Sequence, residues 1–159
     1  MRRSATPVVL VFAAVFFLAL AAAQAPKAGD AALGTRKYGD YQTPQFCGTA
    51  CHTDIYRQWQ QAMMSQAYTH HWDEIEYFEL ALPHAAKEPK VAGIEAGCNG
   101  CHSPLAFLAG DIPTKPPKAQ TRANEGVSCE VCHTIRNMTG ERPGNYNFVV
   151  APGKTKQGN

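Results

Sequence analysis

The stretch CNGCHSPLAFLAGD, residues 98–111, contains two cysteines separated by two residues and followed at once by a histidine. The same pattern returns in CEVCH, residues 129–133. It returns again, with one extra residue between the cysteines, in CGTACH, residues 47–52. These three segments hold all six cysteines of the chain. A histidine directly after every cysteine pair is the feature that an interpretation of this sequence must explain.

Covalent attachment of haem explains both the pairing of the cysteines and the histidine that follows. Two thiols about one helical turn apart add to the two vinyl groups at one edge of the porphyrin. The next residue then lies over the ring, where its imidazole ligates the iron on the proximal side. The sequence therefore predicts three haem c groups, with iron, and the longer first motif requires a small bulge in its turn. The predicted attachment residues are Cys47, Cys51, Cys98, Cys101, Cys129 and Cys132, and the predicted proximal ligands are His52, His102 and His133.

Three other uses of the cysteines fit the pattern less well. A structural zinc site takes four ligands from two paired knuckles, whereas each pair here has its own histidine. Three disulfides would suit an exported chain but give no reason for a histidine after every pair. A redox-active cysteine pair is expected once, beside a thioredoxin-like pattern of strand and helix. Haem attachment is the interpretation that accounts for all three motifs.

The N-terminus has the order of regions found in a secretory signal. Arg2 and Arg3 form a basic head, an apolar run without charges extends from Val8 to Leu20, and Ala21 to Ala23 supply the small residues that signal peptidase accepts. This apolar stretch is shorter than the about 20 residues that span a bilayer core. We expect export by the general secretory route and cleavage of residues 1–23. The mature protein would then have no stable membrane span and would lie in the periplasm or at the cell surface.

The rest of the chain is long enough for one domain but offers little from which to build a core. Proline and glycine are scattered through it, and long apolar stripes are few. Haem macrocycles would supply the buried apolar surface that such a chain lacks. The net charge is only +2 and no basic stripe interleaves with aromatic residues, which excludes nucleic acid as a partner. The predicted organisation is a flexible segment over 24–45, a triple-haem domain over 46–150 and a polar tail over 151–159.

Apolar periodicity predicts helices in the middle of the chain. The stretch from Thr53 to Trp72 has apolar residues at helical spacing and predicts one continuous helix. Thr53 suits its N-cap, and Asp54 in the first turn favours the helix dipole. A second helix is expected over Asp73–Leu82, ended by Pro83. The remaining segments are a short helix or turn over Glu88–Gly97, an extended surface connection over Asp111–Lys118 and a short strand over Tyr146–Val150.

The candidate distal ligands of the irons are the histidines outside the motifs, His70, His71 and His84, together with Met64. On a continuous helix Met64 and His71 would share a face, because they are seven residues apart. At 1.5 Å per residue, Met64 and His70 would lie roughly 18 and 27 Å along the axis from His52. They are therefore expected to serve one of the other two haems, and His84, after a helix break, is free to approach an iron from another direction.

The segments CGTACHTDIYRQWQQAMMSQAY (47–68), CNGCHSPLAFLAGD and EGVSCEVCHTI (125–135) resemble the cytochrome c552/c554 family of multihaem cytochromes. The resemblance extends from Phe46 to Val150. It implies a mainly α fold with extensive irregular loops, in which a small helical chain wraps closely packed haems that are mostly ligated by two histidines.

Two departures from this family stand out. Met64 stands where the family often has a histidine, so either Met64 replaces that ligand or the coordination is missing. Relatives commonly continue into a fourth haem motif, whereas this sequence stops at Asn159. The chain is therefore expected to be a fragment or a shortened member.

The distal ligands decide between the expected functions. If three histidines close three haems, every iron is saturated and electron transfer is the remaining chemistry. We favour an electron carrier whose redox partners are a quinol-linked donor and a terminal reductase or extracellular acceptor. One haem without a distal ligand would instead give a redox enzyme acting on a nitrogen oxide or hydroxylamine. A third alternative is a homo-oligomer in which such subunits stack into a cytochrome filament.

Overall fold

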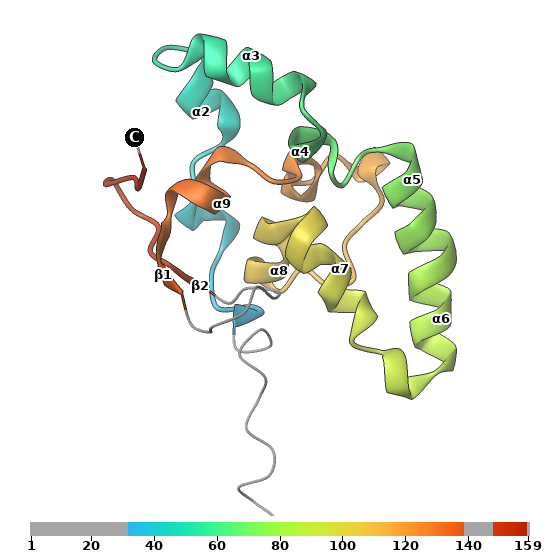
Figure 1. Ribbon diagram of the computed structural model, residues 1–159. Coiled ribbons are helices and arrows are strands. Elements are labelled where there is room, and N and C mark those ends of the chain that lie inside the picture. The colour runs from blue at the N-terminus through green and yellow to red at the C-terminus, as the bar shows by residue number, and fades with distance from the viewer. Residues whose placement is uncertain (1–31, 139–147, 159) are drawn as a thin grey trace, which may run out of the picture.

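The computed structural model describes residues 32–138 and 148–158, so the signal peptide predicted over 1–23 lies outside the described residues. Short helices joined by irregular loops make up most of the described chain, together with two short strands (Figure 1). This confirms the predicted fold class. In chain order the elements are η3 (Tyr38–Asp40), α2 (Pro44–Gly48), α3 (Thr53–Gln61), α4 (Met63–Gln66), α5 (His71–Glu74), η4 (Ile75–Ala81), α6 (Leu82–Lys87), η5 (Pro89–Val91), α7 (Ile94–His102), α8 (Pro104–Ala109), η6 (Pro117–Ala119), η7 (Arg122–Glu125), α9 (Cys129–His133), β1 (Ile135–Met138) and β2 (Phe148–Val150).

Helix α8 lies at the centre of the core, because every side chain from Pro104 to Leu108 is buried. It lies between the rod formed by α5, η4 and α6 on one side and α9 with the strands on the other (Figure 1). Only Ser103 separates it from the second motif, and the Ser103 hydroxyl donates to the Ala123 carbonyl at 3.1 Å. Two clusters meet on α8: Leu105, Phe107 and Leu108 pack with Tyr41, Val131 and Val150, and Ala106 packs with Tyr68 and Ala123.

The segment 32–45, the described part of the stretch predicted as flexible over 24–45, packs against this core. Tyr41 is only 4% exposed. The Arg122 guanidinium donates to the carbonyls of Tyr38 and Tyr41, the latter at 2.9 Å. Glu125 holds that guanidinium in two contacts, of 2.6 Å at Nε and 3.0 Å at Nη2. Such bidentate pairs fix the geometry of the arginine, which therefore ties the N-terminal segment to η7.

The prediction of one helix over 53–72 is wrong, because the chain leaves the helical conformation at Ala62, with φ −83° and ψ 150°. Contacts with a distant segment fix this break. The Trp59 indole donates to the Val127 carbonyl at 2.9 Å, and the Val127 amide donates to the Met64 carbonyl at 2.8 Å. The shared face and the axial distances that a continuous helix implies for Met64 and His70 therefore do not apply.

The helix predicted to end at Pro83 instead continues from α5 through η4 into α6, so this boundary is also wrong. Residues 75–81 are wound as a π-helix, and the Leu82 amide donates to the carbonyl of Tyr77, five residues back. An α-helix would clash at Pro83 with the carbonyl four residues earlier. The wider π turn relieves this clash, so the proline lies in the first turn of α6 rather than beyond the helix end.

The predictions for the three short segments 88–97, 111–118 and 146–150 agree better with the structure. The stretch 88–97 forms η5 and the start of α7, and no regular element precedes η6 in the connection that begins at Asp111. β2 pairs antiparallel with β1, with Phe148 opposite Met138. The first two residues of the strand predicted over Tyr146–Val150 lie outside the described residues.

Gly126 allows the loop before the third motif to dock beside α4. Its φ is +57°, and a Cβ at this position would lie 2.5 Å from the Met64 carbonyl oxygen. We expect G126A to lower the free energy of unfolding by about 3 kcal/mol, because it adds backbone strain and displaces the Val127 hydrogen bond. Chemical denaturation of the purified protein measures this. The control is G93A, whose Cβ would meet no atom within 4 Å; equal stability of the two variants would contradict the prediction.

Candidate cofactor sites

The second and third motifs lie in helices that end at the motif histidine. α7 runs through Cys98 to His102, and α9 comprises residues 129–133. In each motif the first thiol is partly buried and the second is exposed. Burial raises the pKa of Cys98 and of Cys129, so both are held as thiols.

The first motif forms the bulged turn that its extra residue requires. α2 ends at Gly48, and the His52 amide then donates to the Cys47 carbonyl, five residues back, at 3.2 Å. Gly48 is packed under Tyr56, whose Cγ lies 2.2 Å from the position of a Cβ on this glycine. Burial raises the pKa of the Cys47 thiol as well, so all three motifs have the same inner, protonated thiol.

Two of the motif histidines are oriented by acceptors on Nδ1. His102 Nδ1 lies 2.8 Å from the Ala67 carbonyl and 2.8 Å from Asp73 Oδ1. His133 Nδ1 lies 2.6 Å from the Gln157 carbonyl. A carbonyl and a carboxylate only accept, so Nδ1 carries the proton in both rings. The lone pair on Nε2 is therefore available to a metal, as expected of a ligand whose second nitrogen is held by an outer partner.

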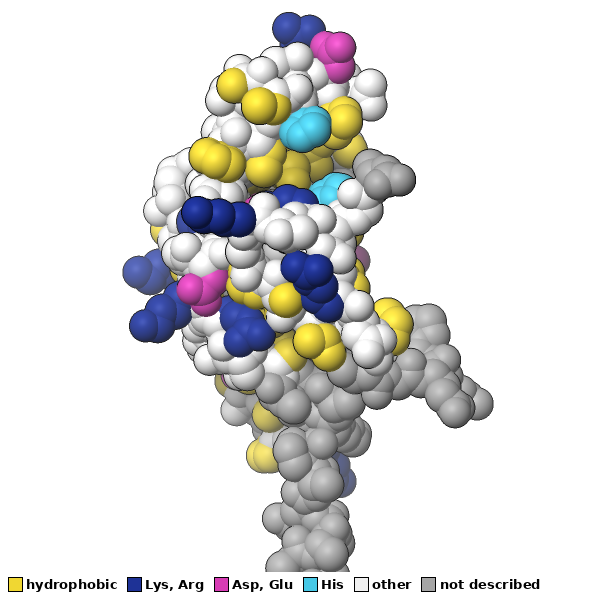
Figure 2. All heavy atoms as spheres, turned by 90° about the vertical axis from the view of Figure 1, so that its left-hand side faces the viewer, with side chains coloured by type: hydrophobic (Ala, Val, Ile, Leu, Met, Phe, Trp, Pro, Cys, Tyr) yellow, Lys and Arg dark blue, Asp and Glu magenta, His cyan; other side chains and the backbone are white. Residues whose placement is uncertain are grey.

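The first and third motifs open onto one cavity of about 420 Å³. It is bounded by Cys47 and His52 from one motif and by Cys129 and His133 from the other. Helix α2, which leads into the first motif through Cys47, packs against α9, which carries Cys129. On the face that carries α2, α9 and the C-terminal segment, hydrophobic side chains surround histidines in a hollow (Figure 2). The cavity falls within the size range of cofactor sites, about 300–1,000 Å³.

The C-terminal segment forms part of this site. Lys156 and Gly158 line the cavity, and Gln157 supplies the acceptor for His133. The Lys156 ammonium is ion-paired with Glu130, whose side chain is 2% exposed. Apart from that ion pair, the Glu130 carboxylate has no hydrogen bond to the described residues. The stretch predicted as a polar tail over 151–159 thus positions a motif histidine and neutralises a buried charge.

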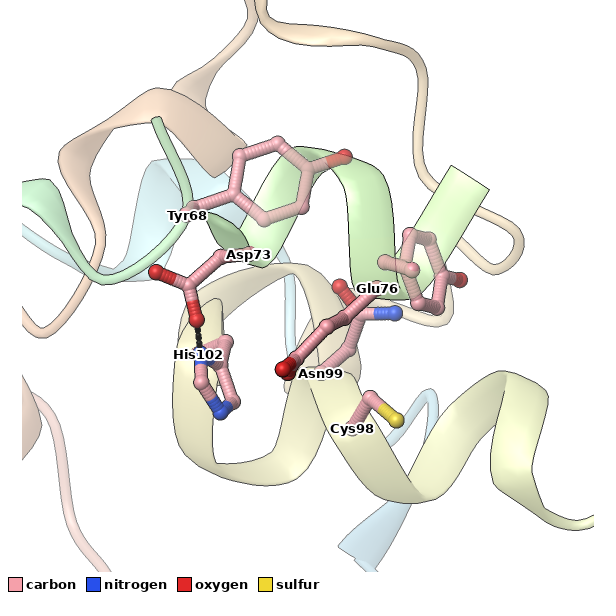
Figure 3. Close-up of a pocket in the computed structure, with 7 residues that line it drawn as sticks. Tyr68, Asp73, Glu76, Cys98, Asn99 and His102 are labelled. Carbon is pink, nitrogen blue, oxygen red and sulfur yellow. Dashed lines mark ion pairs between the residues drawn. The ribbon is translucent and has the colours of Figure 1, made fainter. Parts of the chain in front are cut away.

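The second motif faces a smaller cavity, which its Cys98 and His102 line together with Asp73 and Glu76 (Figure 3). A buried series of hydrogen-bonded polar side chains, which begins at Asn99, supports the motif. Asn99, 1% exposed, accepts from the Thr114 hydroxyl at 3.3 Å.

Tyr68 is the last member of this buried series, because its hydroxyl contacts that of Thr114 and lies 2.8 Å from the Lys115 carbonyl. Burial raises the pKa of Tyr68 to about 12, so the phenol keeps its proton. The connection after α8 is therefore not only a surface loop, because Thr114 links it to the second motif.

These residues fit haem c. Each motif presents one inner and one outer thiol, and at least two of the imidazoles have Nε2 free for iron. Large apolar side chains remain exposed on the described surface, as is typical of surfaces that meet an apolar ligand. Those exposed by more than half are Phe46, Ile55, Met63, Met64, Trp72, Leu80 and Met138. Among the described residues, no cluster of three His, Cys, Asp or Glu side chains could hold a bare metal ion.

The candidate distal ligands are dispersed. His70 caps α5 by accepting from the Trp72 amide at 3.4 Å, and its Nδ1 lies 3.8 Å from Asp73 Oδ2. It thus lies on the Nδ1 side of His102, away from the nitrogen that would ligate iron. His71 is exposed beside Trp72, its ring centroid 6.1 Å away. The other two candidates, His84 on α6 and Met64 on α4, are also exposed. Distal ligation by any of the four stays a prediction.

The family model described as cytochrome c554 and c-prime matches residues 47–134, more than half of the chain. The chain belongs to this family. It is therefore a cytochrome that binds haem c covalently, with iron, and its function is haem-based electron transfer. No curated protein and no solved structure matches it. In the described part of this cytochrome, no helix has the length and apolar character needed to cross a bilayer.

Sequence reasoning missed the residues that orient the motif histidines. Asp73 was placed only as the first residue of a helix, and nothing in the sequence pairs it with His102. Two of the acceptors, at Ala67 and Gln157, are backbone carbonyls, which carry no residue-type signal. The ion pair of Glu130 depends on its burial, which nothing in the sequence marks, and a buried carboxylate needs a cation.

The contribution of the Glu130–Lys156 ion pair to stability can be tested by substitution. Replacing Lys156 by Met leaves a buried carboxylate without its cation, and we expect a loss of about 1–3 kcal/mol in unfolding free energy, because Lys156 is itself one-third exposed. The double variant E130Q/K156M should recover most of this loss, and K154M, at an exposed lysine, should change little. Denaturant midpoints of the haem-loaded protein measure all three. A K156M protein as stable as the wild type would contradict the role of the pair.

Proposed function

We propose that this cytochrome transfers electrons through three haem c groups, one at each motif, and that it does so in the periplasm or at the cell surface. The observation that carries the proposal is the contact between the first and third motifs. Helix α2 packs against α9, and cysteines and histidines of both motifs line one cavity. Two attached haems would therefore lie side by side, as rapid electron exchange between them requires.

The protein's own residues would bind, orient and shield the cofactor. The attachment residues would be the cysteine pairs 47 and 51, 98 and 101, and 129 and 132, with His52, His102 and His133 as proximal ligands. When bound, haem c supplies a reversible one-electron iron couple. The acceptors on His102 and His133 fix the ring orientation and the tautomer, so each imidazole is ready to ligate before and after the electron moves.

Export supports this assignment. Basic, apolar and small-residue regions at the N-terminus form a signal for the general secretory route, and c-type haem is attached after export. We propose protein partners on both sides of the transfer, a quinol-linked donor and a terminal reductase or extracellular acceptor. The exposed edge of the shared cavity, beside α2 and the C-terminal segment, offers such partners an approach to the first and third motifs (Figure 2).

Intact mass and a reductive titration test the number of haems. The mature protein should carry three haems and take up three electrons per chain. The variant C98A/C101A should lose one haem mass and one electron, since no other thiol pair can replace the second motif. Peptide mapping locates the attachment sites. A wild-type protein with two haems, or a variant that still takes up three electrons, would overturn the proposal.

A further inference from the structure

Two of the motif histidines differ in the charge of the groups that lie close to Nδ1. His133 donates to the Gln157 carbonyl, which is neutral, at 2.6 Å. His102 is within 2.8 Å of a carboxylate oxygen of Asp73, and Figure 3 shows this contact from α5 to the end of α7. The Asp73 side chain is 20% exposed, so the contact is partly shielded from water.

We propose that Asp73 is a positioning residue that lowers the reduction potential of the haem attached at the second motif below that of the haem at the third. The inference rests on the proposed function, because it requires haem at Cys98 and Cys101.

The physical reason lies in the basicity of the ligand. A charged acceptor draws the Nδ1 proton more strongly than a carbonyl does. The imidazole then becomes more basic at Nε2, which favours ferric over ferrous iron. A stronger ligand for the oxidised metal makes the site harder to reduce.

The second acceptor on His102 allows Asp73 to be tested without losing the ring orientation. The Ala67 carbonyl also lies 2.8 Å from Nδ1. When Asp73 is replaced by Asn, this carbonyl can keep the proton on Nδ1 and the lone pair on Nε2. Only the charged acceptor is lost.

A second carboxylate at the site provides a matched control for charge. Glu76 lines the same cavity as His102 and extends toward it from η4 (Figure 3). Asp73 is the carboxylate for which the structure gives a contact to the imidazole. E76Q therefore removes one nearby negative charge and leaves the Asp73 contact, whereas D73N removes the negative charge that contacts the imidazole.

The experiment is a potentiometric titration of the wild type, D73N, D73E and E76Q, preceded by peptide mapping of the haems. In D73N we expect the reduction equilibrium constant of one haem to increase about tenfold. For a one-electron couple this raises the reduction potential of that haem by about 59 mV. E76Q should shift it less, and D73E should restore most of the wild-type value. Unchanged potentials in a haem-loaded D73N, or an equal shift in E76Q, would overturn the inference.

Two outcomes separate this inference from the proposed function. If peptide mapping finds no haem at the second motif of the wild type, the proposed function fails there, and the inference with it. If D73N accumulates without that haem, the wild type supplies the measurement through stepwise reduction followed by NMR. The haem on Cys98 and Cys101 should then be reduced after the haem on Cys129 and Cys132, and the opposite order would overturn the inference alone.

Discussion

Burial of one short helix organises this protein. Helix α8 places every side chain from Pro104 to Leu108 in the core, and the N-terminal segment, α9 and the strands all pack on it. Because only Ser103 separates α8 from His102, the packing of α8 in the core also fixes the position of the second motif histidine. With a small buried core among its described residues, the chain positions this site by placing it at the end of its most buried element.

The sequence predicts the chemistry better than the path of the chain. The motifs fix the thiols and imidazoles because cysteine spacing is set by the porphyrin edge, which does not depend on the rest of the fold. The helix over 53–72 was predicted from local periodicity and is broken by hydrogen bonds from Val127, sixty-odd residues away in the sequence. The predicted helix end at Pro83 is wrong for the opposite reason, since a π turn accommodates a residue that local rules treat as a stop.

The outer partners of the histidines could not be predicted, because they depend on tertiary contacts. Gln157 acts through its carbonyl, and the identity of its side chain is irrelevant to that role. Asp73 acts through its carboxylate, but only because α5 is turned toward the end of α7. These partners give chemically similar motifs different surroundings.

The neighbourhood of the first and third motifs bears on how the protein folds. Cys47 and Cys129 line one cavity, although α7 and α8 lie between them in the sequence. Contacts of such long sequence separation form late in folding, because closing a long loop costs chain entropy before the contact stabilises the fold. The shared cavity therefore takes shape only once the core around α8 has brought the two motifs together.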